Sequence, residues 1–260
     1  MKIYLINLDR HPQRLQRMEK LLHGLAFQRI PAVDGRAVAG PAQRDLTRPP
    51  SLENLSGCDK ACTLSHRLAW QDFLAGTEKY ACVLEDDIHL SPDFPRFIND
   101  ESWIPKNGDL VKIETFAQKI FVSRQSVACL DRSASVLLSL HYGTAGYIVS
   151  RKGAADLLQR TAVIDLPADW IVFNEAAIQR HYPIYQLSPA LCVQGINVPD
   201  GIAFAEMQTS IQTRPVKPPK SMPQRIYVEA SRPIRQLSDA LRRQVFQWRH
   251  QARRLTVPFA

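Results

Sequence analysis

Three consecutive carboxylates, Glu85, Asp86 and Asp87, follow an apolar stretch that runs from Tyr80 to Leu84. The stretch predicts a buried strand, and open α/β sheets bind ligands outside the carboxyl ends of their strands. Because adjacent like charges repel, the three acids favour a nearby cation. Mg²⁺ held by one or two carboxylates and by substrate phosphates fits this pattern. The alternative interpretation is a solvated acidic turn.

Two arginines and one aspartate lie near the ends of two earlier predicted strands. Arg10 and Arg14, one helical turn apart after the strand 2–8, could face a pyrophosphate, since guanidinium groups bind phosphate oxygens bidentately. Asp34 closes the strand 27–33 beside a glycine, where the backbone allows a ligand such as a nucleoside to approach closely. Surface arginines and a plain turn are the alternatives.

Ser65 and His66 stand in the middle of a predicted helix that follows Ser56 and Gly57. Helix capping therefore does not explain them. A hydroxyl and an imidazole at this position could hydrogen-bond a sugar. The alternative for the histidine is a structural role inside the fold.

These residues are positioned by elements that alternate between strand and helix. The predicted strands are 2–8, 27–33, 80–84, 109–115 and 142–150, and the predicted helices are 11–25, the one after 56–57, and 152–160. The alternation favours an α/β fold in which a mostly parallel sheet is flanked by helices.

The composition bounds the class of protein. A chain of 260 residues, 45% hydrophobic and 22% charged, is long enough for one large domain with a continuous core. No apolar run reaches the roughly 20 residues that cross a bilayer, and the N-terminus lacks a signal-peptide pattern. We therefore expect the protein to stay in the compartment where it is made.

Its five cysteines, including Cys58 and Cys62 on one helix face, show no zinc signature and are expected to be reduced thiols.

Basic charge is concentrated at the C-terminal end. The chain has a net charge of +8, and residues 221–260 hold eight arginines against two acids. A Pro-rich segment, 205–223, predicts a linker between a catalytic domain, 1–204, and a basic tail, 224–260. One amphipathic helix in the tail is predicted by the spacing of Leu237, Leu241, Val245, Trp248, Ala252 and Leu255. It could lie on an anionic membrane surface or pack on the body, whereas the scarcity of aromatic residues argues against nucleic acid.

Seven short motifs occur in one order over residues 1–195, and together they resemble glycosyltransferase family 25, which includes lipopolysaccharide (lipooligosaccharide) biosynthesis galactosyltransferases. The motifs are Asn7-Leu8-Asp9-Arg10 with Arg14, Pro31 to Gly35, Gly57-Cys58 with Leu64-Ser65-His66 and Trp70, Leu84 to Asp87, Val111 to Thr115, Tyr142 to Tyr147, and Ala168-Asp169-Trp170. The resemblance implies a GT-A-like (Rossmann-type) fold and a nucleotide-sugar donor, commonly UDP-galactose. It also implies a divalent metal, Mn²⁺ or Mg²⁺, and inversion at the anomeric carbon.

The resemblance further implies roles for single residues. Asp87 is expected to hold the metal, with Glu85 in place of the usual first aspartate and His181 as a weaker candidate ligand. Asp169 is the preferred base for the acceptor hydroxyl, and Glu114 is the second candidate. Donor contacts are expected from Asn7, Arg10, Arg14, Asp34, Ser65, His66, Glu85 and Asp86.

These expectations combine into an inverting, metal-dependent transferase that moves a hexose to a saccharide hydroxyl of a lipid-linked acceptor. Acceptors of this kind are anchored at the cytoplasmic face of the inner membrane, so a cytoplasmic, peripheral membrane protein is expected. One alternative is a sugar nucleotidyltransferase, which would usually carry a Gly-rich phosphate loop where Asn7 to Arg10 offers none. The other is a catalytically silent carbohydrate-binding or adaptor protein.

Overall fold

The N-terminal half of the chain alternates strands and helices, as its sequence predicts. In the computed structural model, β1 (Lys2–Asn7), α1 (Pro12–Leu21) and β2 (Phe27–Pro31) lead through the short turn η1 (Gly35–Ala37) to α2 (Gly57–Ala75) and β3 (Tyr80–Glu85). The helix α2 begins at a capping box. The Asp59 N–H donates to the Ser56 hydroxyl, and the Ser56 N–H donates to the Asp59 carboxylate.

The remaining elements are mostly strands. In chain order they are β4 (Ile88–Leu90), α3 (Phe94–Asn99), β5 (Leu110–Lys112), β6 (Glu114–Thr115), β7 (Lys119–Cys129), β8 (Arg132–Leu137), β9 (Gly146–Ser150), α4 (Arg151–Arg160), α5 (Ala168–Phe173), β10 (Ile184–Ser188), β11 (Cys192–Gln194) and β12 (Ala252–Thr256). The structure describes residues 1–41, 43–45, 50–174, 182–195, 232, 236, 238 and 240–260. The predicted linker, 205–223, and the candidate ligand His181 lie outside the described residues.

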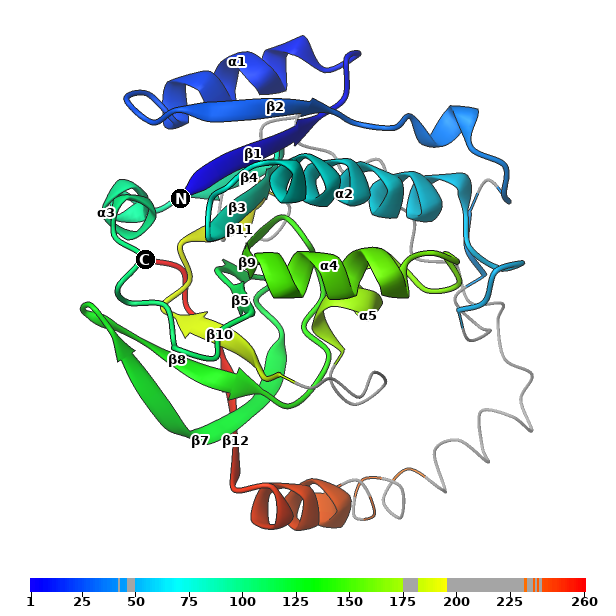
Figure 1. Cartoon of the computed structure of the whole chain (residues 1–260). Coiled ribbons are helices and arrows are strands. Elements are labelled where there is room, and N and C mark those ends of the chain that lie inside the picture. Colours follow the sequence, from blue (N-terminus) through cyan, green and yellow to red (C-terminus); the bar gives the residue numbers. More distant parts are fainter. Residues whose placement is uncertain are drawn as a thin grey trace.

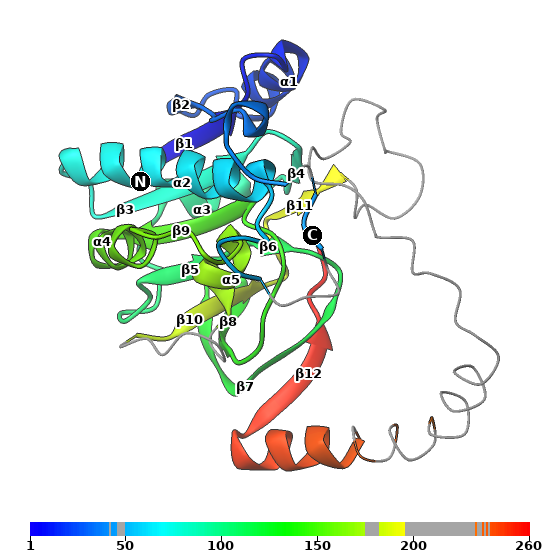
Figure 2. The same cartoon turned by 90° about the vertical axis from the view of Figure 1, so that its right-hand side faces the viewer.

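Within the described residues, nine strands form one mixed sheet in the order β12-β7-β8-β10-β5-β9-β3-β1-β2, and β4, β11 and β6 form a small second sheet (Figures 1 and 2). The predicted α/β class with flanking helices is confirmed. Parallel pairing is confined to β1 with β2 and β3, and to β5 with β10; the other pairs of this sheet are antiparallel. The expectation of a mostly parallel sheet missed the hairpin β7–β8, whose tight turn forces antiparallel pairing.

Two predicted strands, 109–115 and 142–150, differ most from expectation. The stretch 109–115 divides, because Leu110–Lys112 pairs in the large sheet while Glu114–Thr115 joins the small one. The stretch 142–150 forms β9 only from Gly146, and its first residues remain in a loop. The second change leaves Tyr142, Gly143 and Thr144 in a loop at the sheet edge, where they line a cavity.

Helices cover both faces of the large sheet (Figure 1). The helices α1 and α3 pack on one face, and their buried Met18 and Phe97 belong to one apolar cluster. The helices α2, α4 and α5 pack on the other face, where Trp70, Leu157 and Phe173 belong to a second cluster. Alternate residues of a strand point to opposite faces, so the buried strands β1 and β3 contribute to both clusters.

The C-terminal segment departs from the predicted single helix. Residues 240–249 are helical, but Gln251 has a left-handed backbone (φ 46°), and Ala252–Thr256 pair with the edge of β7 as β12. The edge of β7 offers unpaired backbone groups, which favour a strand over a longer helix. After β12 the buried Val257 accepts from the Thr115 hydroxyl. No helix in the described part of the chain is long and apolar enough to span a membrane.

Candidate active site

A cavity of about 370 Å³ opens at the carboxyl ends of β1, β2 and β3. Residues that follow each of these strands line it, and α2, the loop 142–144 and the start of α5 complete its wall. The strands are parallel and in register, with Ile6 of β1 opposite Glu85 of β3. Residues that leave the three strands therefore meet at one sheet edge, which is where the sequence predicts a ligand.

Asp86 is anchored to the first strand and helix. The Asn7 amide donates to its Oδ2 at 2.6 Å, and the Arg14 guanidinium donates to its Oδ1 at 3.1 Å. Arg17 donates to the backbone carbonyls of Asp86 and Ile88 and so holds the turn after β3. The structure thus brings together three residues that were predicted to contact the donor, Asn7, Arg14 and Asp86. Their side chains hydrogen-bond one another.

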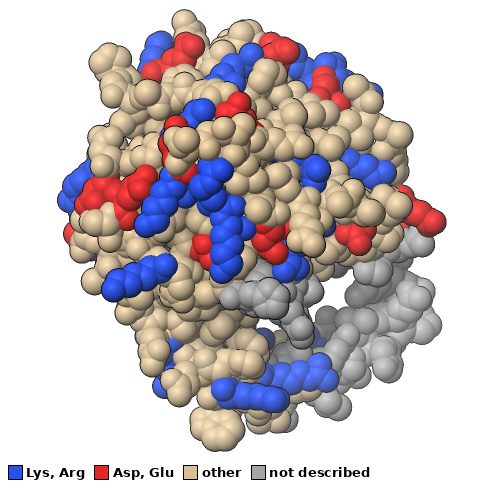
Figure 3. Space-filling model, viewed as in Figure 1, with Lys and Arg blue, Asp and Glu red and all other residues tan. Residues whose placement is uncertain are grey.

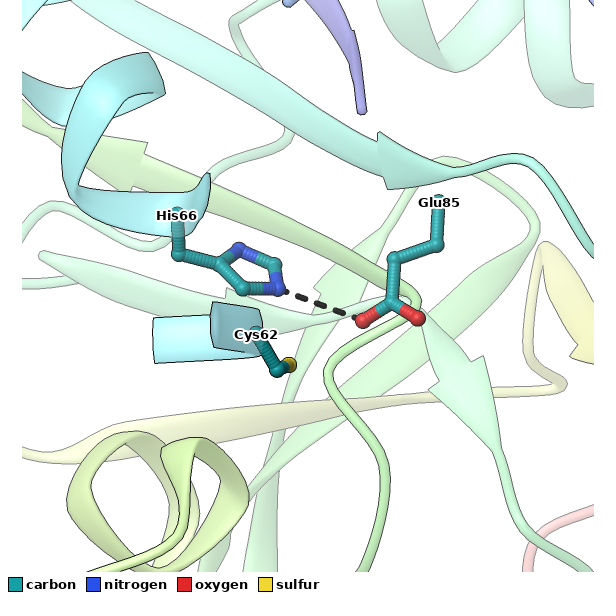
Figure 4. A group of neighbouring side chains, drawn as sticks. All are labelled: Cys62, His66 and Glu85. Atoms are coloured by element: carbon teal, nitrogen blue, oxygen red, sulfur yellow. Dashed lines mark hydrogen bonds and ion pairs between the residues drawn. The ribbon is translucent and has the colours of Figure 1, made fainter. Parts of the chain in front are cut away.

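Glu85 points instead toward α2 (Figure 4). Its Oε1 lies 3.2 Å from His66 Nε2 and accepts from the Thr144 hydroxyl at 2.7 Å. Burial acts to raise the pKa of Glu85, but its hydrogen bonds with His66 and Thr144, together with the charge of Lys112, outweigh burial and lower that pKa. Glu85 is therefore held ionised beside the imidazole.

Asp87 differs from the other two acids, because in the described part of the chain one of its carboxylate oxygens is buried without a hydrogen-bond partner. This oxygen is Oδ1, and the side chain as a whole is almost fully buried. Burial, together with the charges of Glu85 and Asp86, raises the pKa of Asp87 to about 8. A buried carboxylate without a partner carries a large desolvation cost, so this position suits a cation.

Asp169 lines the same cavity from the first turn of α5. The N-cap of this helix is Pro167, so Asp169 is not its capping residue. Its carboxylate accepts from the N–H groups of Trp170 at 2.9 Å and Gly143 at 3.4 Å. Burial by the surrounding protein raises the pKa of Asp169. A carboxylate with a raised pKa and access to a cavity can take up a proton.

Glu114 lies behind the cavity wall and does not line it. It is fully buried, accepts from Lys112 Nζ at 2.8 Å and from the Ala145 N–H at 3.0 Å, and stands directly behind Gly143. Burial raises the pKa of Glu114 to about 7. Its contacts support the loop 143–145 and leave no direct path to a substrate in the cavity.

The remaining predicted donor residues have protein partners. Arg10 lines the cavity but forms an ion pair with Asp34, which also binds Arg36 and does not line the cavity. These hydrogen bonds hold the pKa of Asp34 well below its usual range. Ser65 lines the cavity, donates to the Ala61 carbonyl at 2.7 Å and accepts from the Val33 N–H at 2.9 Å, so it ties α2 to the end of β2.

Among the cavity residues that the sequence analysis did not single out are Arg44 and Phe116, and Phe116 lies beside Tyr142 of the predicted motif 142–147. The Arg44 Nη1 is buried and has no hydrogen-bond partner in the part of the chain that the structure describes. The rings of Phe116 and Tyr142 meet edge to face with centroids 6.1 Å apart. The Pro/Arg-rich composition around Arg44 predicts only a loop, and the two aromatic residues are 26 positions apart. No local pattern pairs them.

Replacing Gly143 by Ala is expected to distort this wall. Gly143 has φ +85°, and an added Cβ would lie 2.4 Å from Glu114 Oε1. Gly24 is a matched control, since it has φ +82° and nothing within 4 Å of an added Cβ. We expect Gly24→Ala to lower the free energy of unfolding by about 1–2 kcal/mol for the left-handed backbone. Gly143→Ala should cost about 1–3 kcal/mol more for the collision.

Urea denaturation of the two variants measures this difference. Equal losses would show that Glu114 moves aside freely and does not support the loop.

The sequence of this chain is similar to those of known proteins. The model of the family described as "Glycosyltransferase family 25 (LPS biosynthesis protein)" matches residues 1–172. Lacto-N-neotetraose biosynthesis glycosyltransferase LgtE of Neisseria meningitidis serogroup B is 36% identical over 155 residues, covering 55% of each chain. LgtB of the same organism is 32% identical over 188 residues, covering 67% of this chain and 68% of the relative.

Two further similarities are more distant. Lipooligosaccharide biosynthesis protein lex-1 of Haemophilus influenzae is 30% identical over 147 residues, covering 52% of this chain and 49% of the relative. A solved glycosyltransferase involved in glycosylation of the major capsid of PBCV-1 covers 74% of this chain and 92% of its own, with a TM-score of 0.38 and 13% identity. The chain thus spans about half the length of several curated relatives that it matches. The family model covers well over half of the chain, and the chain belongs to glycosyltransferase family 25.

Proposed function

We propose that this protein is a glycosyltransferase that moves a hexose from a nucleotide-diphosphate donor, most simply UDP-galactose, to a saccharide hydroxyl of a lipooligosaccharide acceptor. Family membership and the names of its Neisseria and Haemophilus relatives support this choice. The observation that carries it is the cavity at the carboxyl ends of β1–β3, which brings Asp87 and Asp169 to one site. The two carboxylates suit two different tasks in an inverting transfer.

Asp87 would hold the divalent cation, Mn²⁺ or Mg²⁺. Its buried, unpartnered Oδ1 and its raised pKa fit a site that a positive ion completes. The bound ion supplies positive charge for the phosphates of the departing nucleoside diphosphate. Glu85 is the weaker ligand candidate, because His66 and Thr144 already engage its Oε1. Arg44 adds a further positive charge to the same cavity.

Asp87→Asn should change how the stability of the metal-free protein depends on pH. In the folded protein Asp87 keeps its proton up to about pH 8, whereas in the unfolded chain it releases the proton near pH 4. The folded state therefore binds more protons across this window, and its stability falls as pH rises from about 4 to 8. Asp87→Asn removes this component, so its thermal midpoint should fall less between pH 6 and pH 9.

The same thermal unfolding measurement is repeated with a divalent cation added. At pH 8, Mn²⁺ or Mg²⁺ should raise the thermal midpoint of the wild-type protein, because the ion binds the folded state alone. The same addition should leave Asp87→Asn unchanged. Equal stabilisation of both proteins would remove Asp87 from the metal site.

Asp169 is the proposed base. An inverting transfer needs a base within hydrogen-bond reach of the acceptor hydroxyl. Asp169 lines the cavity, and the N–H groups of Gly143 and Trp170 orient its carboxylate. Glu114 is less suited, since it is fully buried behind Gly143 and paired with Lys112.

Asp169→Asn should separate binding from transfer. The variant keeps the shape of the carboxylate but cannot take the proton, so we expect donor binding within a few-fold of wild type and turnover lowered by about 100-fold or more. The assay measures UDP released from UDP-galactose with a divalent cation, with and without truncated lipooligosaccharide. Asp165→Asn is the matched control, because Asp165 is exposed in the preceding loop.

The outcomes of this assay are distinct. Loss of donor binding in Asp169→Asn, or full turnover, contradicts its role as the base. If the wild-type protein releases no UDP from any UDP-hexose in the presence of acceptor, the chain is a silent binder. Formation of a nucleotide sugar from a sugar phosphate and a nucleoside triphosphate would identify a nucleotidyltransferase.

The C-terminal helix supports a peripheral location at the cytoplasmic face of the inner membrane, where a lipid-linked acceptor is anchored. Leu241, Val245 and Trp248 share one helix face and are exposed, Trp248 by 83%. Arg242, Arg243 and Arg249 are exposed on the same helix, and basic side chains gather at the lower end of the molecule in Figure 3. Exposed apolar residues flanked by arginines match a helix that lies on anionic lipid.

Trp248→Ala should weaken binding to vesicles that contain phosphatidylglycerol by about tenfold, through loss of roughly 1.4 kcal/mol of apolar burial. Co-sedimentation with the vesicles measures the change. Leu52→Ala, which removes a 52% exposed apolar side chain elsewhere, is the control. Unchanged binding of Trp248→Ala would exclude this helix as the lipid contact.

A further inference from the structure

Cys62, His66 and Glu85 point toward one another on the wall of the cavity (Figure 4). Cys62 and His66 are four residues apart on α2, so they share one helix face, and Glu85 comes from the end of β3. One ligand atom from each lies within 4.8 Å of the others. We propose that these three side chains bind Zn²⁺, or a cation of similar softness, at a site separate from Asp87.

The ligand set favours zinc over the hard cation proposed for Asp87. Zn²⁺ accepts thiolate, imidazole and carboxylate ligands together, whereas Mg²⁺ prefers oxygen alone. His66 Nε2 and Glu85 Oε1 are 3.2 Å apart. Two ligands of a tetrahedral zinc ion with bonds of about 2.0–2.1 Å have nearly this separation.

Neighbouring groups already orient the ligands. His66 Nδ1 lies 2.9 Å from the Tyr147 hydroxyl, which accepts from Trp70 Nε1 at 2.7 Å. The imidazole therefore presents Nε2 toward Glu85. The Thr144 hydroxyl donates to Glu85 and lies 3.9 Å from Cys62 Sγ. Such outer contacts fix ligand orientation in zinc proteins and strengthen binding.

The surrounding charge attracts a cation. Carboxylates surround the group: Glu85 belongs to it, and Asp59 and Asp169 also act on Cys62 electrostatically. When zinc binds, the S–H bond breaks, the sulfur bonds the metal, and the proton leaves to solvent; a coordinated thiol is deprotonated in this way.

Three protein ligands leave a fourth position of the ion free, and all three ligands line the cavity. The free position can take water or a group of a bound molecule. Zinc would also occupy part of the cavity, beside the Thr144 hydroxyl that orients Glu85. Inhibition of transfer by zinc follows from this placement and rests on the proposed function, whereas zinc binding itself does not.

Cobalt titration tests the site without any sugar nucleotide. Co²⁺ replaces Zn²⁺ in such sites, and a cobalt–thiolate bond gives a charge-transfer absorption band. The metal-free protein should show this band at one equivalent of Co²⁺, and Zn²⁺ should abolish it while excess Mg²⁺ should not. Cys62→Ser should lose the band and bind at least tenfold more weakly. Cys58→Ser, one turn earlier on α2 and lining the same cavity, should keep both.

A second variant distinguishes loss of a metal ligand from misfolding of the protein. Glu85→Gln preserves the shape of the side chain, so it should keep the thiolate band but need at least tenfold more Co²⁺ to reach it. Far-UV circular dichroism of each metal-free variant confirms that it is folded. Absence of the band in the wild-type protein, its persistence in Cys62→Ser, or its loss in Cys58→Ser would overturn the assignment. Failure of UDP release with an intact cobalt site would instead contradict only the proposed function.

Discussion

Mutual repulsion among three consecutive carboxylates is the constraint on which the site depends. The protein meets it for two of the acids by pairing each with different neighbours. Asp86 turns back to Asn7 and Arg14, and Glu85 turns to His66 and Thr144. Asp87 alone keeps a buried oxygen without a partner among the described residues. The parallel register of β1 with β3 makes this separation possible, because it brings the partners of Asp86 to the same sheet edge.

Behind the cavity, two charges of opposite sign are buried together. Lys112 and Glu114 are both fully buried and bind one another, and Lys112 Nζ lies 4.1 Å from the centre of the Phe173 ring. Glu114 also holds the loop at Ala145, while the Gly143 N–H donates to Asp169. A pair of this kind adds little net stability, but removing either partner leaves a buried charge. The pair therefore fixes the backbone that orients Asp169.

The sequence predicts the parts of this arrangement that local pattern determines. Apolar stretches and their polar ends locate β1, β3, α4 and the start of α1 closely, and they place the acidic triplet correctly at the end of a buried strand. Pairing between distant segments carries no such pattern. The hairpin β7–β8, the division of 109–115 between two sheets, and the position of Glu114 behind Gly143 all depend on long-range contacts. The sequence does not reveal the group formed by Cys62, His66 and Glu85 for the same reason, because its ligands come from two separate elements.

The C-terminal segment shows how local spacing and long-range pairing compete. Apolar residues from Leu237 to Leu255 are spaced for one helix, yet β12 pairs with β7 and the helix ends before it. Packing on the body, one of the two alternatives for the tail, thus holds for its last residues, while one face of the helix stays exposed. The strand and Val257 pack on the body, and Phe246 contacts the Phe121 ring with centroids 5.1 Å apart. Because the strand fixes one end of the helix to the sheet, a surface that binds its exposed apolar face would hold the cavity at a defined orientation.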